Sequence, residues 1–60
     1  MTPAATQVWT TTHPHVPDRR VVGVGDDYVL YERGYIPRIR RVSMRAWAAW
    51  VRENQAVVKQ

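Results

Sequence analysis

The chain has 60 residues, of which 45% are hydrophobic and 23% are charged, and it contains no cysteine. A chain this short has room for one domain, and its composition is typical of a globular protein. The absence of cysteine excludes disulfides, thiolate zinc sites and cysteine nucleophiles. Nine Lys and Arg residues against five Asp and Glu residues give a net charge of +4, which favours an acidic partner, nucleic acid above all.

The sequence carries neither a membrane-span pattern nor a secretory-signal pattern. No segment has the run of about 18 apolar residues that a membrane span requires. The first twenty residues lack a basic region followed by an apolar run. We therefore expect a cytoplasmic protein with no membrane partner.

Residues 1–17 differ in composition from the rest of the chain. They contain no charged side chain and three of the four prolines. We expect a partly irregular N-terminal arm, followed by a single small domain over residues 18–60. Within the arm, residues 7–11 are rich in β-branched and aromatic side chains, which predicts a short strand near this position. Trp9 of that strand is expected to cover one end of the core.

Two β-rich segments follow, Arg20–Val24 and Tyr28–Arg33, and they are separated by Gly25–Asp27. Glycine and aspartate accept the turn conformations that β-branched residues refuse, so the pattern predicts a β-hairpin. A third extended segment is expected over Ile36–Val42. Within it, Pro37 marks an edge strand or the start of a strand.

The periodicity changes at Ser43, which can cap a helix. The spacing of the apolar side chains that follow predicts a helix over 44–54, and the apolar residues 56–58 then form a closing strand. Trp47 lies in the middle of the apolar stripe and is expected in the core, with Val22, Leu30, Met44 and Val51 as neighbours. Trp50 lies at the margin of the stripe, where it is either a lid over the core or an exposed anchor.

The arginines carry the strongest functional signal. Residues 33–45 contain five arginines and no acidic residue, and eight of the nine basic residues of the chain are arginine. The planar guanidinium pairs with phosphate or carboxylate and stacks on rings, and nearby tyrosines add stacking surfaces for single-stranded nucleic acid. The alternative is that these side chains only solvate the surface. The candidate binding residues are Arg33, Tyr35, Arg38, Arg40, Arg41, Arg45 and Arg52.

The sequence predicts no enzymatic, metal or cofactor site. His13 and His15 are too few to hold a metal without further ligands at a defined spacing. Asp26 and Asp27 are interpreted as turn residues, and the segment 23–25 lacks the third glycine of a dinucleotide-binding motif. We therefore expect a non-enzymatic protein without metal or cofactor.

The order of these elements resembles a small SH3-like barrel. More narrowly, it is similar to small basic accessory proteins of bacteriophage and prophage genomes, in which a hairpin of the form V-x-G-V-x-x-x-x-V-x-Y, here Val21 to Tyr31, precedes an Arg-rich strand and a Trp-containing helix. The resemblance covers about residues 7 to 58. It implies a viral accessory role in the host cytoplasm, either handling nucleic acid or blocking a host defence or transcription machine, and it implies no catalytic residues.

The expected fold class is α+β and mostly β: a small SH3-like barrel or a curved antiparallel sheet of four or five short strands with one C-terminal helix. A winged or helix-turn-helix fold, with 43–54 as recognition helix, is the alternative, although only one good helical segment is present. The expected function is a phage-type binding module whose Arg-rich face contacts nucleic acid or a nucleoprotein complex. The alternative is an anti-host inhibitor, such as an anti-CRISPR protein, that acts on an acidic protein surface. A homodimer is left open.

Overall fold

The computed structural model describes residues 2–59. Its elements follow in the order β1 (Val8–Thr10), β2 (Arg19–Val24), β3 (Tyr28–Arg33), β4 (Arg40–Ser43), α1 (Met44–Asn54) and β5 (Val57–Val58). The predicted fold class, mostly β with one helix near the C-terminus, is confirmed. Within residues 2–59, no helix has the length and apolar character needed to cross a membrane.

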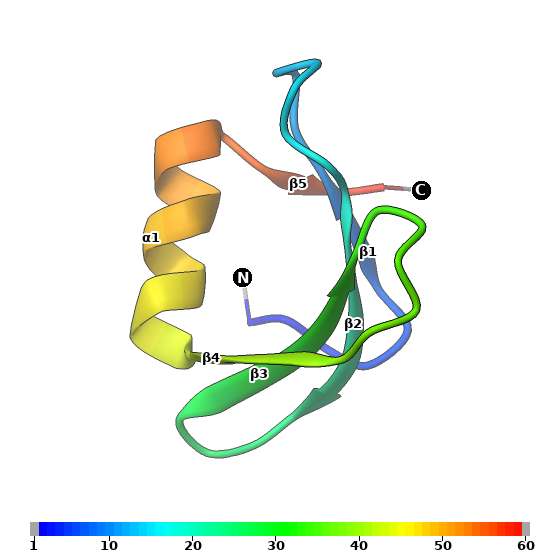
Figure 1. The fold of residues 1–60 in the computed structure, drawn as a ribbon. Coiled ribbons are helices and arrows are strands. Elements are labelled where there is room, and N and C mark those ends of the chain that lie inside the picture. Colours follow the sequence, from blue (N-terminus) through cyan, green and yellow to red (C-terminus); the bar gives the residue numbers. More distant parts are fainter. Residues whose placement is uncertain (1, 60) are drawn as a thin grey trace.

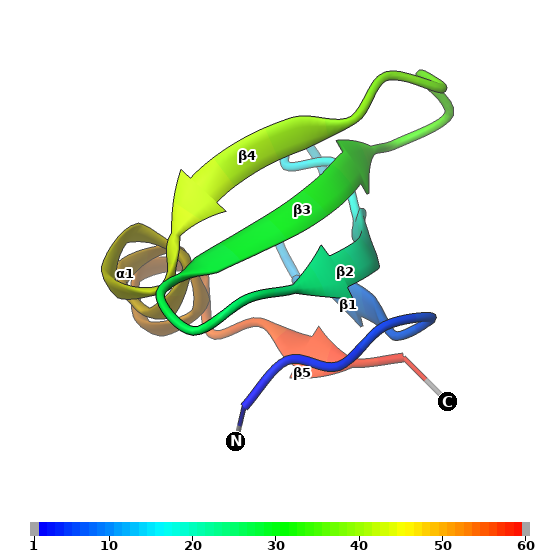
Figure 2. The same ribbon diagram turned by 90° about the horizontal axis from the view of Figure 1, so that it is seen from below.

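The strands form one antiparallel sheet in the order β4-β3-β2-β1-β5. β4 and β5 are the edges, and within residues 2–59 no pairing joins them, so the sheet is open. An antiparallel sheet of five short strands with one C-terminal helix lies within the fold class expected from the sequence. The chain passes from one edge of the sheet to the other through α1, which lies on one side of the twisted sheet (Figures 1 and 2).

The predicted hairpin is formed by β2 and β3, and it contains a β-bulge. The pairing register shifts between Val21 and Gly23. A bulge inserts one extra residue into a strand. Val21 is paired with the buried Tyr31 ahead of the bulge and is itself buried, at 1% exposure. Successive residues of a strand face opposite sides, and Val22 is 40% exposed. The expectation that Val22 would contact Trp47 in the core is therefore wrong.

The inward side of β3 carries Val29 and Tyr31. Both are buried, whereas Leu30 between them is only partly buried and points to the other side. Alternate residues of a strand face opposite sides of a sheet, so Leu30 cannot share the inner side with its neighbours. The expectation that Leu30 would be a core neighbour of Trp47 is therefore also wrong.

The helix α1 has the bounds that the sequence predicts. Ser43 is its N-cap, because its side-chain oxygen accepts a hydrogen bond of 3.0 Å from the backbone N–H of Ala46. At the other end, Gln55 adopts a left-handed conformation with φ of 53°, and the N–H of Ala56 donates to the carbonyl of Val51. This reversal directs the chain back to the sheet as β5.

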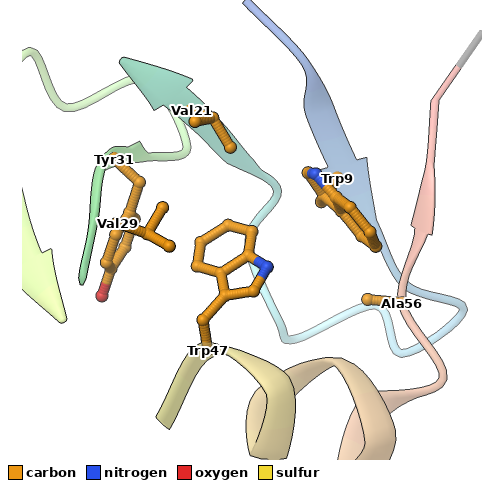
Figure 3. Packing of buried hydrophobic residues seen from close by; sticks show 6 residues of the cluster. All are labelled: Trp9, Val21, Val29, Tyr31, Trp47 and Ala56. Atoms are coloured by element: carbon orange, nitrogen blue, oxygen red, sulfur yellow. The ribbon is translucent and has the colours of Figure 1, made fainter. Parts of the chain in front are cut away.

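Trp47 lies at the centre of the core, as predicted, with 1% exposure (Figure 3). Its ring meets Trp9 and Tyr31 edge to face, at centroid separations of 5.9 and 5.5 Å. Met44 and Val51 pack against this cluster, as expected, and so does Trp50. Trp50 is partly buried, so it forms a margin of the core. The buried cluster consists of Trp9, Val21, Val29, Tyr31, Trp47 and Ala56.

The third strand begins later than predicted. The expectation placed an extended segment over 36–42, but β4 starts only at Arg40. Gly34 turns the chain with φ of 61°, and the N–H of Arg38 donates to the carbonyl of Ile36 at 2.8 Å. Pro37 between them has no N–H to give to a ladder. Residues 34–39 therefore form an exposed segment, which we call the β3–β4 loop.

The N-terminal strand β1 occupies an interior position in the sheet, between β2 and β5. Trp9 at its centre is 3% exposed and belongs to the buried cluster. The side chain of Gln7 accepts hydrogen bonds from the indole N–H of Trp9 and from the backbone N–H of Ala4. Residues 4–10 therefore contribute directly to the sheet and to its core.

Candidate binding surface

The strand register divides the arginines of the sheet between its two faces. We define the inner face as the one that carries Val21 and Tyr31, which are paired and buried. Arg19 and Arg33 are also paired with each other, and each lies two residues from one of these buried side chains. Side chains two residues apart on a strand share a face, so both arginines belong to the inner face. Arg40 pairs with Tyr31 and shares that face as well.

Arg19 is held on aromatic rings. Its guanidinium carbon lies 4.5 Å from the centroid of Tyr31 and 4.1 Å from the centroid of Trp50. Distances of this size bring the cation into favourable contact with the ring faces. Trp50 therefore links α1 to the first residue of β2 through the side chain of Arg19.

The surroundings of Arg19 disfavour its charge. Burial lowers the pKa of Arg19 below its ordinary value, Tyr31 opposes that shift, and the charges of Arg33 and Arg40 lower the pKa further. Within residues 2–59, the ion pairs are Arg20–Glu32 and Asp18–Lys59, and neither includes Arg19. We call Arg19, Arg33 and Arg40 the arginine cluster.

Arg19 is not among the residues predicted from the sequence, because it lies outside the arginine-rich segment 33–45. A signal was available in the hairpin. Counting back from the turn at 25–27 places the start of the first strand opposite Arg33. The stacking on Trp50, however, depends on how α1 packs against the sheet, and no local pattern gives that contact.

Arg41 lies on the outer face of the sheet, opposite the side of Arg40. It pairs with Leu30, and its guanidinium carbon lies 4.4 Å from the centroid of the Tyr28 ring. Arg40 and Arg41 therefore project from opposite faces of β4. Arg38 belongs to neither face, because it lies in the β3–β4 loop and not in a strand.

The β3–β4 loop exposes a tyrosine, two isoleucines and an arginine. The exposed fractions are 104% for Tyr35, 54% for Ile36 and 58% for Ile39. The N–H of Gly34 donates to the carbonyl of Asp18 at 2.8 Å, which ties the base of the loop to the start of β2. The loop therefore exposes apolar and cationic side chains, and in the sequence it lies between Arg33 and Arg40 of the arginine cluster.

The remaining two candidate arginines lie on α1, and both are exposed. Arg52 occupies the last turn, where the helix dipole favours a cation. Arg45 occupies the first turn, where the dipole disfavours a cation and where no acidic residue is present. Helix stability therefore explains Arg52 but does not explain Arg45.

A hollow of about 450 Å³ lies beside the base of the β3–β4 loop, and its lining includes Val8, Arg20, Tyr35 and Lys59. Its cations are compensated: Arg20 forms an ion pair with Glu32, and Lys59 lies 3.9 Å from Asp18. Among residues 2–59, the basic side chains without an ion pair lie elsewhere, on the arginine cluster, the loop, Arg41 and α1.

Comparison of the chain with protein-family models, curated proteins and solved structures finds no match. The resemblance to phage accessory proteins therefore stays a prediction. The arrangement itself provides guanidinium groups for oxyanions and the exposed ring of Tyr35 for stacking.

Proposed function

We propose that this chain is a non-enzymatic module that binds single-stranded nucleic acid through the arginines of β3, β4 and the β3–β4 loop. The observation that carries the proposal is the lack of compensation. Among residues 2–59, the carboxylate partners found for basic side chains belong to Arg20 and Lys59 only. Arg33, Arg38, Arg40 and Arg41 are left available for an external anion.

The chemistry of these side chains suits nucleic acid in two ways. Guanidinium groups form paired hydrogen bonds to phosphate oxygens, and their charge attracts the phosphate backbone. Single strands also offer unstacked bases, which bind exposed aromatic rings in a sequence-tolerant way. Tyr35 is the fully exposed ring beside these arginines.

A salt titration tests the proposal. A fluorescently labelled single-stranded oligonucleotide is titrated with the protein at several salt concentrations. Each phosphate contact to a single strand contributes a slope of roughly −0.7 to the plot of log K against log salt, so three or more contacts predict a slope of about −2 or steeper. No measurable binding at low salt would contradict the proposal.

A second candidate function is favoured by the apolar side chains of the β3–β4 loop. Tyrosine, isoleucine and arginine side chains that are exposed together suit the centre of a protein–protein interface. In this alternative, the chain is an anti-host inhibitor that inserts the loop into an acidic or RNA-binding groove of a protein or nucleoprotein complex. The phage setting and the cytoplasmic location belong to this proposal in either form.

The loop also separates the two candidates. The change Ile36→Ser/Ile39→Ser removes apolar surface and leaves all charges in place. For a nucleic-acid-binding module, oligonucleotide affinity should change less than threefold, about 0.7 kcal/mol. For an inhibitor, binding to a host protein or nucleoprotein complex isolated with the parent chain should fall by about tenfold or more, because these side chains would be buried in the interface.

A further inference from the structure

We propose that the arginine cluster of Arg19, Arg33 and Arg40 is a phosphate-binding site. The inference rests on the proposed function for the source of that phosphate, a bound nucleic-acid strand. The inference goes beyond that function because it assigns a phosphate group to one defined site. Arg19, which lies outside the arginine-rich segment 33–45, has the central position in this site.

Three like charges are brought together on the inner face of the sheet. Arg19 and Arg33 are directly paired across neighbouring strands, and Arg40 is paired with Tyr31 on the next strand. Like charges opposite one another destabilise a sheet. Within residues 2–59, no carboxylate forms an ion pair with any of the three. An external anion would remove this repulsion.

Arg19 is held against two aromatic rings. Its guanidinium carbon lies 4.5 Å from the centroid of Tyr31 and 4.1 Å from the centroid of Trp50. A guanidinium that contacts ring faces can still donate its N–H groups to an acceptor. Among residues 2–59, no side-chain hydrogen bond of Arg19 is found. The rings therefore position a cation whose N–H donors are available to a ligand.

Three guanidinium groups from three strands offer more donors than the two oxygens of a carboxylate can accept. Inorganic or terminal phosphate has additional anionic oxygens, and a backbone phosphodiester adds two ester oxygens to its two non-bridging ones. Charge-assisted hydrogen bonds from guanidinium to either kind of phosphate are strong. The number of donors in the cluster therefore suits a phosphate group.

The arginine cluster lies close to the exposed ring of the β3–β4 loop. Tyr35 lies two residues after Arg33 and is fully exposed. Two residues span at most about 7 Å. A phosphate held by Arg33 therefore places the neighbouring nucleotide within reach of the Tyr35 ring, whereas free inorganic phosphate would use the arginine cluster alone.

The test uses inorganic phosphate and a single-stranded oligonucleotide as two separate probes. Each is titrated into ¹⁵N-labelled protein, with chloride replacing phosphate at equal ionic strength in the reference. The indole N–H signal of Trp50 reports on the site, since that ring contacts Arg19. We expect saturable shifts with inorganic phosphate. Arg40→Gln should weaken the affinity about tenfold, the loss expected of one charge-assisted hydrogen bond.

Two further variants complete the design. Arg19→Gln should weaken phosphate binding by a similar factor. Arg19 is partly buried, so this change can impair folding. Arg40 is exposed, so Arg40→Gln still tests the site in that case. Arg20→Gln is the matched control. It removes the same charge from the neighbouring position, where Arg20 is paired with Glu32, and should leave phosphate affinity unchanged.

The outcomes separate this inference from the proposed function. If phosphate produces no saturable shift, or if Arg40→Gln and Arg20→Gln bind it equally well, the arginine cluster is not a phosphate site, even when the oligonucleotide still binds elsewhere. If phosphate binds at the cluster and the oligonucleotide does not bind, the site is upheld with free phosphate as its source. The proposed nucleic-acid function is then overturned.

Discussion

The guanidinium carbon of Arg19 lies 4.1 Å from the centroid of the Trp50 ring. Through this contact, the first residue of β2 is joined to α1, while the same guanidinium also covers Tyr31 of the core. The two rings stabilise the position of the cation, and the charges of Arg33 and Arg40 oppose it. The folded chain therefore keeps a cationic cluster that only an anion would relieve.

This cluster predicts that added salt stabilises the protein. Repulsion within the cluster and across the net charge of +4 is screened as ionic strength rises. We expect the midpoint of thermal unfolding to increase with sodium chloride. The increase should be smaller for Arg40→Gln, which removes one member of the cluster. A midpoint that falls with salt, equally in both proteins, would contradict this account.

The contribution of Arg19 to the free energy of unfolding should not depend on pH near neutrality. Burial lowers the pKa of Arg19 in the folded state. A cationic group whose pKa is lower in the folded state reduces the free energy of unfolding at every pH where the folded and unfolded states are both protonated. This free energy rises with pH only where the folded state has lost the proton and the unfolded state still holds it. That range is strongly alkaline. Between about pH 6 and 9, Arg19→Gln should therefore shift the unfolding free energy by a constant amount.

We expect Trp47 to contribute more to the free energy of unfolding than any other core residue. Trp47→Ala should cost about 3–5 kcal/mol, enough to unfold much of so small a domain. Trp47→Phe should cost less, because an aromatic ring remains and because the buried indole nitrogen of Trp47 has no hydrogen-bond partner among residues 2–59 to lose. Chemical denaturation measures both. If Trp47→Ala leaves stability unchanged and abolishes target binding, Trp47 is a binding anchor and not a core residue.

Gly25 should be intolerant of a side chain. A Cβ atom added at Gly25 would overlap the ring of Tyr28, which is the ring that Arg41 covers. We expect Gly25→Ala to displace this ring and to cost about 1–3 kcal/mol. Gly23→Ala is the control, because its added Cβ would be 3.7 Å from Leu30 in ordinary contact. Equal unfolding midpoints for the two variants would refute the argument.

The sequence predicts the helix and the hairpin because their signals are local. Ser43 caps α1 through a neighbouring N–H, and the residues of the turn at 25–27 accept conformations that the flanking strands refuse. The inward side chains of the hairpin could not be predicted in the same way. Alternation separates Val21 from Val22, but the packing of α1 decides which of the two faces is buried. The buried cluster around Trp47 contains Val21, Val29 and Tyr31, so the expectation that Val22 lies in the core is wrong.

The candidate site was predicted only in part. The run of arginines after Arg33 identifies the cationic part of the chain, but periodicity cannot divide those side chains between two faces when the strand begins only at Arg40. Arg19 joins the site through a pairing across strands and a contact with Trp50. Both are tertiary relationships, which a local pattern does not contain.

Charge reversal on β4 and the loop tests the role of the guanidinium groups. Arg38→Glu/Arg40→Glu should weaken oligonucleotide binding by at least tenfold, about 1.4 kcal/mol, because repulsion replaces attraction. Both side chains are exposed, so stability should move by about 0.5 kcal/mol or less. In Arg38→Lys/Arg40→Lys, retained affinity indicates a Coulombic contact, and lost affinity indicates paired or stacked contacts that only arginine makes.

The most direct test of the central claim compares two double variants of equal net charge by the anisotropy of a labelled single-stranded oligonucleotide at low salt. Arg38→Gln/Arg40→Gln removes charges that have no carboxylate partner among residues 2–59, whereas Arg20→Gln/Lys59→Gln removes charges that are already paired. The account predicts at least tenfold weaker binding, about 1.4 kcal/mol, for the first variant and parental affinity for the second. Equal affinities for the two would contradict it, because binding would then follow net charge alone and not this surface.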